Sequence, residues 1–394
     1  MGKSYDIVIA GGAVMGSSLA FWLTRLAGRR LSILVVERDP TYATSATALS
    51  VASIRQQFSN PVNVRISRFG IEFIRNVADW LGQEGGVTDL GLREQGYLFL
   101  AGTDDQAAAM REVAQVQKAE GAGTMLLSPD QLAARFPWLA LADVTLGSFG
   151  ARDEGWFDNM GLLGGFRRAA RARGVDYVKD EAVSLERQGD RITAVNLAGD
   201  GRVECGAVVN AAGTRAVGLL RSIGEEFPVE PRKRTVFLVD APNVRAPDAP
   251  LLVDHTGFYL RPEGRHWITA TVPQDDGPAD PDDFEPNLTE FEDAVWPRLY
   301  ARAPGFDAVK VLRAWAGQYD YNTLDQNAIL GVWPRASNLY LMNGFSGHGL
   351  QQSPAVGRGL AELILTGTYQ TIDLSPLGPE RILRNEPFLE RAIV

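Results

Sequence analysis

Two glycine-rich turns, one near each end of the chain, carry the clearest chemical signal in the sequence. Gly11-Gly12-Ala13-Val14-Met15-Gly16 follows an apolar strand predicted at residues 5–10 and opens a predicted helix. Gly344-Phe345-Ser346-Gly347-His348-Gly349 follows a predicted strand at 338–342 in the same way. Such turns present backbone N–H groups and the positive end of a helix to an anion, typically a phosphate. Their presence at both ends suggests that the two ends of the chain build one nucleotide-binding site.

Glu37 supports a dinucleotide at the first turn. It ends a second apolar strand, predicted at 31–37, about 20 residues after the glycines. An acid in this place accepts hydrogen bonds from the ribose hydroxyls and repels a 2′-phosphate. The alternative interpretation of Glu37 is an ordinary surface carboxylate after a strand. The turn departs from G-x-G-x-x-G at Ala13, which is one methyl group larger than glycine.

The order of the predicted elements indicates which dinucleotide binds. A nicotinamide-dependent dehydrogenase keeps the strands of its nucleotide domain contiguous. This sequence leaves that domain after two strands and returns to it with Ala207-Val208-Val209-Asn210-Ala211-Ala212-Gly213. The sequence also has no second G-x-G-x-x-G at mid-chain, where a flavin reductase would bind NAD(P)H. The pattern therefore favours FAD, with an organic substrate as its reductant.

Residues 45–59, 313–331 and 344–352 together carry a family resemblance. They resemble the FAD-dependent oxidoreductase-domain branch of the D-amino-acid-oxidase and sarcosine-oxidase superfamily. That branch includes opine and secondary-amine oxidoreductases and a mitochondrial complex I assembly flavoprotein. The resemblance covers nearly the whole chain. It implies that the turn at 344–349 lies at the N1/O2 edge of the flavin, where its N–H groups stabilise the anionic reduced ring.

A set of cofactor-binding residues follows from the two turns and the resemblance. The residues expected to bind FAD are Gly11, Gly12, Ala13, Val14, Met15, Gly16, Glu37, Arg38, Ser45, Thr47, Ser50, Val183, Ala211, Ala212, Gly213, Gly344, Gly347, His348, Gly349, Leu350 and Gln351. A non-covalent linkage is expected, because Gln318 stands where sarcosine oxidases carry the cysteine that binds flavin. The loop at 42–53 also lacks the histidine that serves this purpose in related dehydrogenases.

Arg55 is the residue expected to bind the substrate. It aligns with the arginine that pairs the amino-acid carboxylate in sarcosine oxidases, and the planar guanidinium suits bidentate binding of a carboxylate. A structural ion pair with the nearby helix is the alternative. Gln351 stands where sarcosine oxidases have a second carboxylate-binding lysine. This departure suggests a substrate larger than sarcosine or differently polar.

Three more residues are candidates for the catalytic site. Tyr259 and Arg261 lie on a predicted strand at 257–261 and point to the same side, because side chains alternate along a strand. Arg261 would suit a second carboxylate, as in an opine; ordinary surface polarity is the alternative. His348 could act as a base, although its backbone could equally be what matters in the flavin turn.

The composition restricts the classes of partner. The 394 residues are 45% hydrophobic with a net charge of −9, which is typical of a globular protein and argues against a nucleic-acid or anionic membrane surface. The single cysteine allows no intrachain disulfide and favours a reducing compartment, so a cytoplasmic location is expected. The three histidines and the cysteine show no metal-ligand spacing. Residues 1–6 show no apolar signal region, and no run is long enough to span a membrane.

The predicted fold class is α/β. A discontinuous Rossmann-like FAD-binding domain (1–82, 150–220 and 332–394) receives an inserted antiparallel-sheet substrate domain (83–149 and 221–331), as in the D-amino-acid-oxidase and sarcosine-oxidase fold. Helices are predicted at 14–26, 61–81, 104–120, 159–173 and 288–301, and after the second turn to residue 365. Further strands are predicted at 97–101, 175–178, 192–197, 202–205, 207–213 and 310–318, with a β-rich region at 227–272. The acidic, proline-rich stretch 273–286 is expected to be a solvated surface loop.

These features predict an FAD-dependent enzyme that oxidises the C–N bond of a secondary amino acid. Hydride transfer to flavin N5 and hydrolysis of the imine would give a carbonyl compound and an amine. The partners expected are a carboxylated amine and an electron acceptor, either oxygen or a carrier. The alternatives are a flavin-bound assembly protein without turnover, oxidation of a primary amine such as a D-amino acid or glycine, and a nicotinamide-dependent dehydrogenase.

Overall fold

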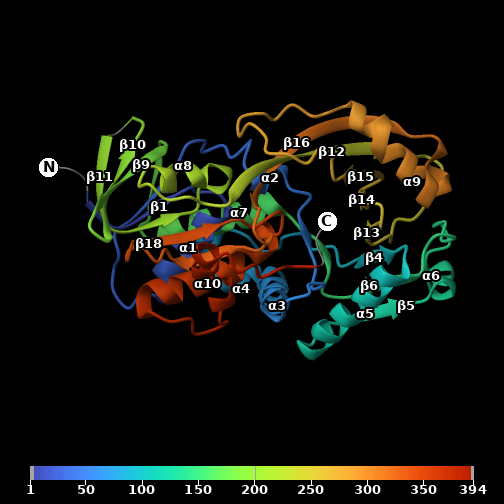
Figure 1. The fold of residues 1–394 in the computed structure, drawn as a ribbon, viewed down its shortest axis with the longest axis horizontal. Helices are drawn as coiled ribbons and strands as arrows, with labels where there is room; N and C mark the ends of the chain where they lie inside the picture. Colours follow the sequence, from blue (N-terminus) through green and yellow to red (C-terminus); the bar gives the residue numbers. More distant parts are fainter. Residues whose placement is uncertain (1–3, 200, 392–394) are drawn as a thin grey trace.

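The computed structural model describes residues 4–199 and 201–391, and two eight-stranded sheets lie side by side in it (Figure 1). Residues 1–3, 200 and 392–394 lie outside the described residues. They include part of the N-terminal stretch 1–6 and parts of the predicted FAD-binding segments. Within the described ranges, no helix is both long and apolar enough to cross a membrane.

The first sheet is mainly parallel. Its strands, in spatial order, are β17 (Ile329–Val332), β18 (Leu339–Asn343), β11 (Gly201–Asn210), β1 (Ser4–Ala10), β2 (Ile33–Glu37) and β8 (Asp176–Lys179); β10 (Arg191–Leu197) and β9 (Ala182–Gln188) extend it from β11. β1 pairs in parallel with both β11 and β2, and β11 pairs in parallel with β18. Ala10, Asn210 and Leu341 are register partners, so three strands end at one edge of the sheet.

Apolar side chains on both faces of the first sheet explain why its strands read as continuous hydrophobic runs. Ile7 and Ile9 of β1 face one core with the helices α1 (Val14–Leu26), α3 (Pro61–Arg75), α4 (Val77–Gly85), α7 (Asn159–Ala172) and α10 (Gly349–Thr366). Val8 and Ala10 face a second core with α8 (Ala216–Arg221). Burial on both sides fixes the sheet that carries the two glycine turns.

The second sheet is mainly antiparallel. Its order is β16 (Lys310–Asn322), β12 (Val229–Asp240), β15 (His266–Thr271), β14 (Phe258–Glu263), β13 (Leu251–Val253), β4 (Tyr97–Ala101), β6 (Leu146–Gly150) and β5 (Thr124–Leu127). Helices α5 (Asp104–Ala119), α6 (Pro129–Arg135) and α9 (Trp296–Arg302) lie around it (Figure 1). The long strands β12 and β16 arch from this sheet towards the first one. The α/β class and the fold are therefore as predicted.

Short elements complete the chain. They are α2 (Ala46–Leu49), α11 (Glu380–Arg384), the 3-10 turns η1 (Gly213–Arg215), η3 (Pro304–Asp307) and η4 (Ser375–Leu377), and the strand pair β3 (Ser53–Ile54) and β7 (Gly155–Trp156). The boundaries between the two predicted domains remain a prediction. β17, which begins at Ile329, pairs within the first sheet three residues before the predicted boundary at 332.

Four predicted elements differ in the structure. The helix predicted at 61–81 is two helices, because Asn76 leaves helical geometry (φ −108°, ψ 31°) and its side chain bonds the Glu72 carbonyl. The strands predicted at 202–205 and 207–213 are one strand, β11. Gly206 lies within it where a side chain would be crowded, because a Cβ there would lie 2.8 Å from the Asp6 carbonyl oxygen. The helix predicted at 288–301 begins with a π-helical turn, η2 (Phe291–Val295), before α9.

Candidate functional site

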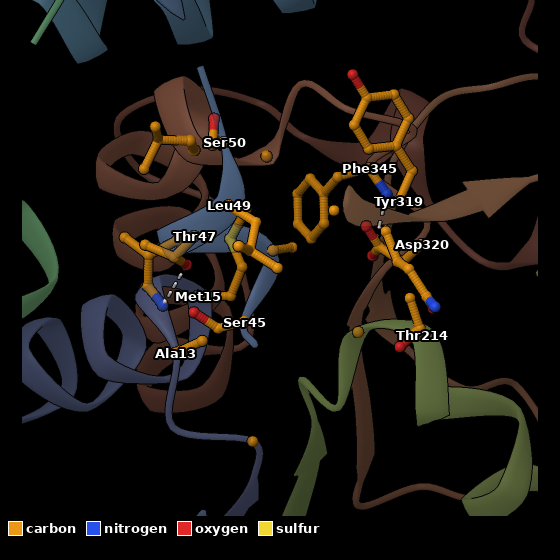
Figure 2. A pocket seen from close by; sticks show the side chains of 18 of the residues that line it. Ala13, Met15, Ser45, Thr47, Leu49, Ser50, Thr214, Tyr319, Asp320 and Phe345 are labelled. Atoms are coloured by element: carbon orange, nitrogen blue, oxygen red, sulfur yellow. Dashed lines mark hydrogen bonds between the residues drawn. The ribbon is translucent and has the colours of Figure 1, made fainter. Parts of the chain in front are cut away.

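One cavity of about 580 Å³ opens where both glycine turns meet the second sheet. Figure 2 shows its opposing walls. Ala13 and Met15 of the first turn and Ser45, Thr47 and Ser50 beside it form one wall. Tyr319 and Asp320 of β16, Phe345 of the second turn and Thr214 of η1 form the other. The cavity therefore joins segments from the two ends and the middle of the chain.

The first turn is shaped for close approach of a ligand to the backbone. Gly11 has φ +99°, and a Cβ there would lie 2.2 Å from the Ala211 carbonyl oxygen. Ala13 has φ −66°, which any residue adopts, so its methyl group fits the turn without strain. No side chain of the turn caps α1, although Thr47 Oγ1 accepts from the Val14 N–H at 3.3 Å (Figure 2). The N-terminus of α1 thus provides an anion site.

Glu37 lies at the cavity wall and is bound to the first turn. Its Oε2 accepts from the Gly12 N–H at 2.8 Å and its Oε1 from the Asp39 N–H at 2.9 Å. Burial raises its pKa, while these two hydrogen bonds oppose the shift. Each oxygen keeps a lone pair for another donor, such as a ribose hydroxyl. Its neighbour Arg38 also lines the cavity.

The second turn is held by a residue that the sequence interpretation missed. Asp320 accepts from the Gly344 N–H at 2.8 Å and the Phe345 N–H at 3.2 Å (Figure 2), and desolvation raises its pKa to about 6. Gly347 has φ +92°, and a Cβ there would lie 2.8 Å from the Tyr319 ring. Asp320 lies on β16, and β17 and β18 separate it from the turn along the chain, so no local spacing signalled this contact.

Arg55 is a buried cation at the cavity. Its Nη1 donates to the Gln57 carbonyl at 2.6 Å, and its Nη2 lies 3.1 Å from His348 Nε2. The guanidinium carbon lies 4.3 Å from the Phe58 ring centroid. Among the described residues, no carboxylate lies within 4.0 Å of Arg55, although its side chain is almost fully buried. The alternative of a structural ion pair therefore finds no partner in this part of the chain.

His348 is neutral and its ring is engaged by Arg55. Burial first, and the charge of Arg55 second, lower the pKa of His348 to about 3. A guanidinium only donates hydrogen bonds, so Nε2 accepts and the ring proton lies on Nδ1. Gln351 also serves Arg55, because its Oε1 accepts from the Arg55 backbone N–H at 2.7 Å. His348 and Gln351 thus fix the side chain and the main chain of the same arginine.

Tyr259 lines the cavity, whereas Arg261 does not. Arg261 donates from Nε and Nη2 to the Val51 carbonyl at 3.2 and 3.0 Å and pairs with Glu263. Arg234, which the sequence interpretation missed, does line the cavity, but both its terminal nitrogens bond Asp276, at 2.6 and 2.9 Å. Unlike Arg234, Arg55 therefore lines the cavity without a carboxylate partner among the described residues.

Most predicted cofactor residues line this cavity, and three glycines lie just behind it. The predicted residues that line it are Gly11, Ala13, Val14, Met15, Glu37, Arg38, Ser45, Thr47, Ser50, Val183, Ala211, Ala212, Gly213, Gly347, His348, Gly349, Leu350 and Gln351. Gly12, Gly16 and Gly344 are outside the lining and shape the turns instead; a Cβ at Gly16 would lie 1.9 Å from the Gly11 carbonyl oxygen.

The acidic stretch 273–286 is a loop of exposed and half-buried residues, as predicted, and its Pro281 and Phe284 also line the cavity. Asp282 forms ion pairs with Arg38, at 3.0 Å, and with Arg215, so two cations beside the first turn hold the loop. The loop lies against the cavity because Asp282 pairs with cations from distant segments, which its own composition does not reveal.

The fold and the cavity define a dinucleotide-binding protein of the kind in which a second sheet covers the cofactor. A family model described as DAO, FAD dependent oxidoreductase, matches residues 6–363. FAD-dependent oxidoreductase domain-containing protein 1 of Xenopus laevis is 42% identical over 424 residues, covering 99% of this chain and 85% of that protein.

Solved structures agree with this family. L-Proline dehydrogenase from P. horikoshii superposes with a TM-score of 0.85 at 25% identity, covering 98% of this chain and 100% of that one. Glycine oxidase from Geobacillus kaustophilus gives 0.80 at 21% identity, with 95% and 98% covered. The chain belongs to the DAO family of FAD-dependent oxidoreductases, and FAD is its cofactor. The Gly11 cradle, the open end of α1 and the Glu37 carboxylate fit that cofactor.

Glu37→Ala should weaken FAD binding. The variant removes a charged acceptor for the ribose and leaves the Gly12 N–H without its partner. A charge-assisted hydrogen bond of about 1.5–3 kcal/mol predicts a Kd for FAD raised by roughly 10- to 150-fold. Quenching of flavin fluorescence as apoprotein rebinds FAD measures this. Glu186→Ala, which changes an exposed acid on β9 that pairs with Arg202, is the control. Wild-type affinity in Glu37→Ala would show that Glu37 does not hold the ribose.

The FAD should be released without cleavage of a covalent bond. Cys205 is outside the cavity lining, and Gln318 lines it where a linking cysteine would stand. Of the described residues lining the cavity, His348 is the one histidine, and Arg55 occupies its Nε2. Precipitation with acid should leave the yellow colour in the supernatant. A pellet that fluoresces on a denaturing gel would contradict this expectation.

Proposed function

We propose that this protein oxidises the C–N bond of a secondary, N-substituted amino acid, with Arg55 binding its carboxylate. The observation that carries the proposal is the buried Arg55 guanidinium at the cavity, which has no carboxylate within 4.0 Å among the described residues. Burying an unpaired charge is costly, and a substrate carboxylate would compensate it with a charge-assisted hydrogen bond.

The chain orients the substrate and stabilises charge around the reaction. Bound FAD supplies a hydride acceptor for the carbon next to the amine nitrogen. Arg55, fixed by Gln57, His348 and Gln351, holds the carboxylate end. The N-terminus of α10 opens at the second turn without a side-chain cap, so its dipole favours negative charge developing nearby. Water then hydrolyses the imine product to a carbonyl compound and an amine.

No side-chain base is required in this scheme. His348 is neutral, but its Nε2 lone pair already accepts from Arg55. The pKa of Tyr259 is raised well above its usual value by burial, so its phenol stays protonated. We infer that the amine binds without its proton and that the protein contributes orientation and exclusion of water.

The similarity to L-proline dehydrogenase supports a secondary amine, because the nitrogen of proline carries two carbon substituents. Glycine oxidase, whose named substrate is a primary amine, supports the alternative. Anaerobic bleaching of the flavin by a panel of primary and secondary amino acids separates these substrates. If no amine bleaches it, the alternative of a flavin-bound assembly protein without turnover replaces the proposal.

Arg55→Ala should raise the KM for a carboxylated amine by about 10- to 150-fold, from the roughly 1.5–3 kcal/mol of a charge-assisted hydrogen bond. Flavin content should stay close to that of the wild type. Arg55→Lys is the matched variant: it keeps the charge but loses the planar fork, so it should restore part of the affinity. Steady-state kinetics with an artificial acceptor measure both. Unchanged KM in Arg55→Ala would remove Arg55 from the substrate site.

Turnover with oxygen alone should be slower than turnover with an acceptor dye. In sarcosine oxidases a lysine over the flavin promotes the reaction with oxygen, and none of the described residues lining this cavity is a lysine. The acceptor we propose is therefore a carrier. Oxygen consumption and dye reduction, measured at equal substrate concentration, give the two rates. Peroxide formed as fast as dye is reduced would overturn this expectation.

A further inference from the structure

Glu154 is a second buried charge close to Arg55. It lies between β6 and β7 and is 2% exposed. No lysine, arginine or histidine of the described residues lies within 4.0 Å of its carboxylate. The Glu154 carboxyl group packs closely against β6, because a Cβ on Gly150 would lie 2.1 Å from Glu154 Oε2. Two opposite buried charges, Arg55 and Glu154, thus lie near each other without forming a direct ion pair.

Gln57 bridges the two charges. Its main-chain carbonyl accepts from Arg55 Nη1 at 2.6 Å, and its side-chain Nε2 donates to Glu154 Oε2 at 2.8 Å. Glu154 Oε1 accepts from the backbone N–H of Gln56, the residue before Gln57, at 2.7 Å. One carboxylate therefore holds the segment 55–57 at two successive residues. Any change at Glu154 is transmitted to the carbonyl that orients the Arg55 guanidinium.

The polarity of this network requires an acceptor at position 154. Gln57 Nε2 also donates to the Tyr97 carbonyl at 2.9 Å, and Gln57 Oε1 accepts from Ser148 Oγ at 2.6 Å. Because a carbonyl only accepts, the amide of Gln57 cannot turn over without losing that bond. Glu154 must then accept from Gln57 and from Gln56 at once. A carboxylate provides two acceptor oxygens, whereas an amide provides one.

We propose that Glu154 is the positioning residue of Arg55 and that its charge sets the affinity of the site for carboxylates. The inference rests on the proposed function of Arg55. Ionised Glu154 repels an incoming carboxylate and partly offsets the field of Arg55. Neutral Glu154 leaves that field unopposed. The same residue thus holds the arginine in place and controls how strongly the arginine attracts its ligand.

The surroundings of Glu154 allow its charge to change near neutral pH. Burial raises the pKa of Glu154 to about 7, while the Gln57 and Gln56 hydrogen bonds and the charge of Arg55 oppose the shift. The other ionisable groups facing it are Asp153, which pairs with Arg75 at 2.5 Å, and Tyr97. As the pH rises through the pKa of Glu154, the acid becomes increasingly ionised and carboxylate binding weakens.

The test measures propanoate binding to the holoenzyme from the change in flavin absorbance. Propanoate has a carboxylate but no amine, so the titration of a substrate nitrogen does not enter. In the wild type, its Kd should rise by roughly 3- to 10-fold between pH 6 and 9, as expected for a pKa that shifts by up to about one unit on binding. In Glu154→Gln the Kd should be nearly independent of pH over this range.

Ser148→Ala is the matched control. It removes a hydrogen bond of Gln57 from the same network without changing a charge, so its Kd should keep the pH dependence of the wild type. If Glu154→Gln fails to retain FAD, Glu154→Asp replaces it; the shorter acid, whose ordinary pKa is also lower, should move the pH at which the Kd begins to rise.

The outcomes separate this inference from the proposed function. Propanoate that binds Arg55→Ala as tightly as the wild type would refute the role of Arg55 itself. Binding that depends on Arg55 but has the same pH dependence in Glu154→Gln, or in Glu154→Asp, as in the wild type would overturn the role of Glu154 alone. Loss of the pH dependence in Glu154→Gln, with its retention in Ser148→Ala, supports the assignment.

Discussion

The parallel pairing of β11 between β1 and β18 is the constraint on which the rest of the site depends. Ala10, Asn210 and Leu341 share one register line, so the segments that follow them emerge at a single edge of the first sheet. The two glycine turns and the η1 turn follow these strands and meet there, although they are far apart in the sequence. In open α/β sheets, ligands bind at the carboxyl ends of the strands, where helix N-termini converge. A cofactor that spans several turns can therefore be held by one short edge.

The second sheet forms part of the cavity at this edge. β16 contributes Tyr319 and Asp320 to the wall opposite the first turn (Figure 2), and Asp320 fixes the second turn through two backbone N–H groups. Two residues of the acidic loop 273–286 line the cavity, and its Asp282 pairs with Arg38 and Arg215. These contacts join β16 and the loop 273–286 to segments that follow strands of the first sheet. Polar contacts thus fix β16 and this loop against the segments that surround the cavity.

Two arginines that line the cavity, Arg55 and Arg234, differ in their electrostatic surroundings. Among the described residues lining the cavity, Arg234 is neutralised by Asp276, whereas Arg55 has aromatic rings, a carbonyl and a neutral histidine as its neighbours. A cation in such surroundings keeps its attraction for an external anion, because no nearby charge screens it at short range. The bridge through Gln57 places the nearest opposing charge, Glu154, one residue further away. This spacing leaves Arg55 available for a ligand while its position stays fixed.

The sequence by itself determined the local elements: both glycine turns, the apolar strands of a buried parallel sheet and Glu37 after the second strand. These follow from periodicity and from the demands of phosphate groups, which act over a few residues. Only the tertiary structure decided the roles of Asp320, Glu154, Arg261 and the loop 273–286, and the break of the predicted 61–81 helix at Asn76. For the first four, hydrogen-bond partners and ion pairs distant in sequence set burial and charge; at Asn76, one side-chain bond to a carbonyl outweighed an uninterrupted helical pattern. Neither kind of information is present in a one-dimensional pattern.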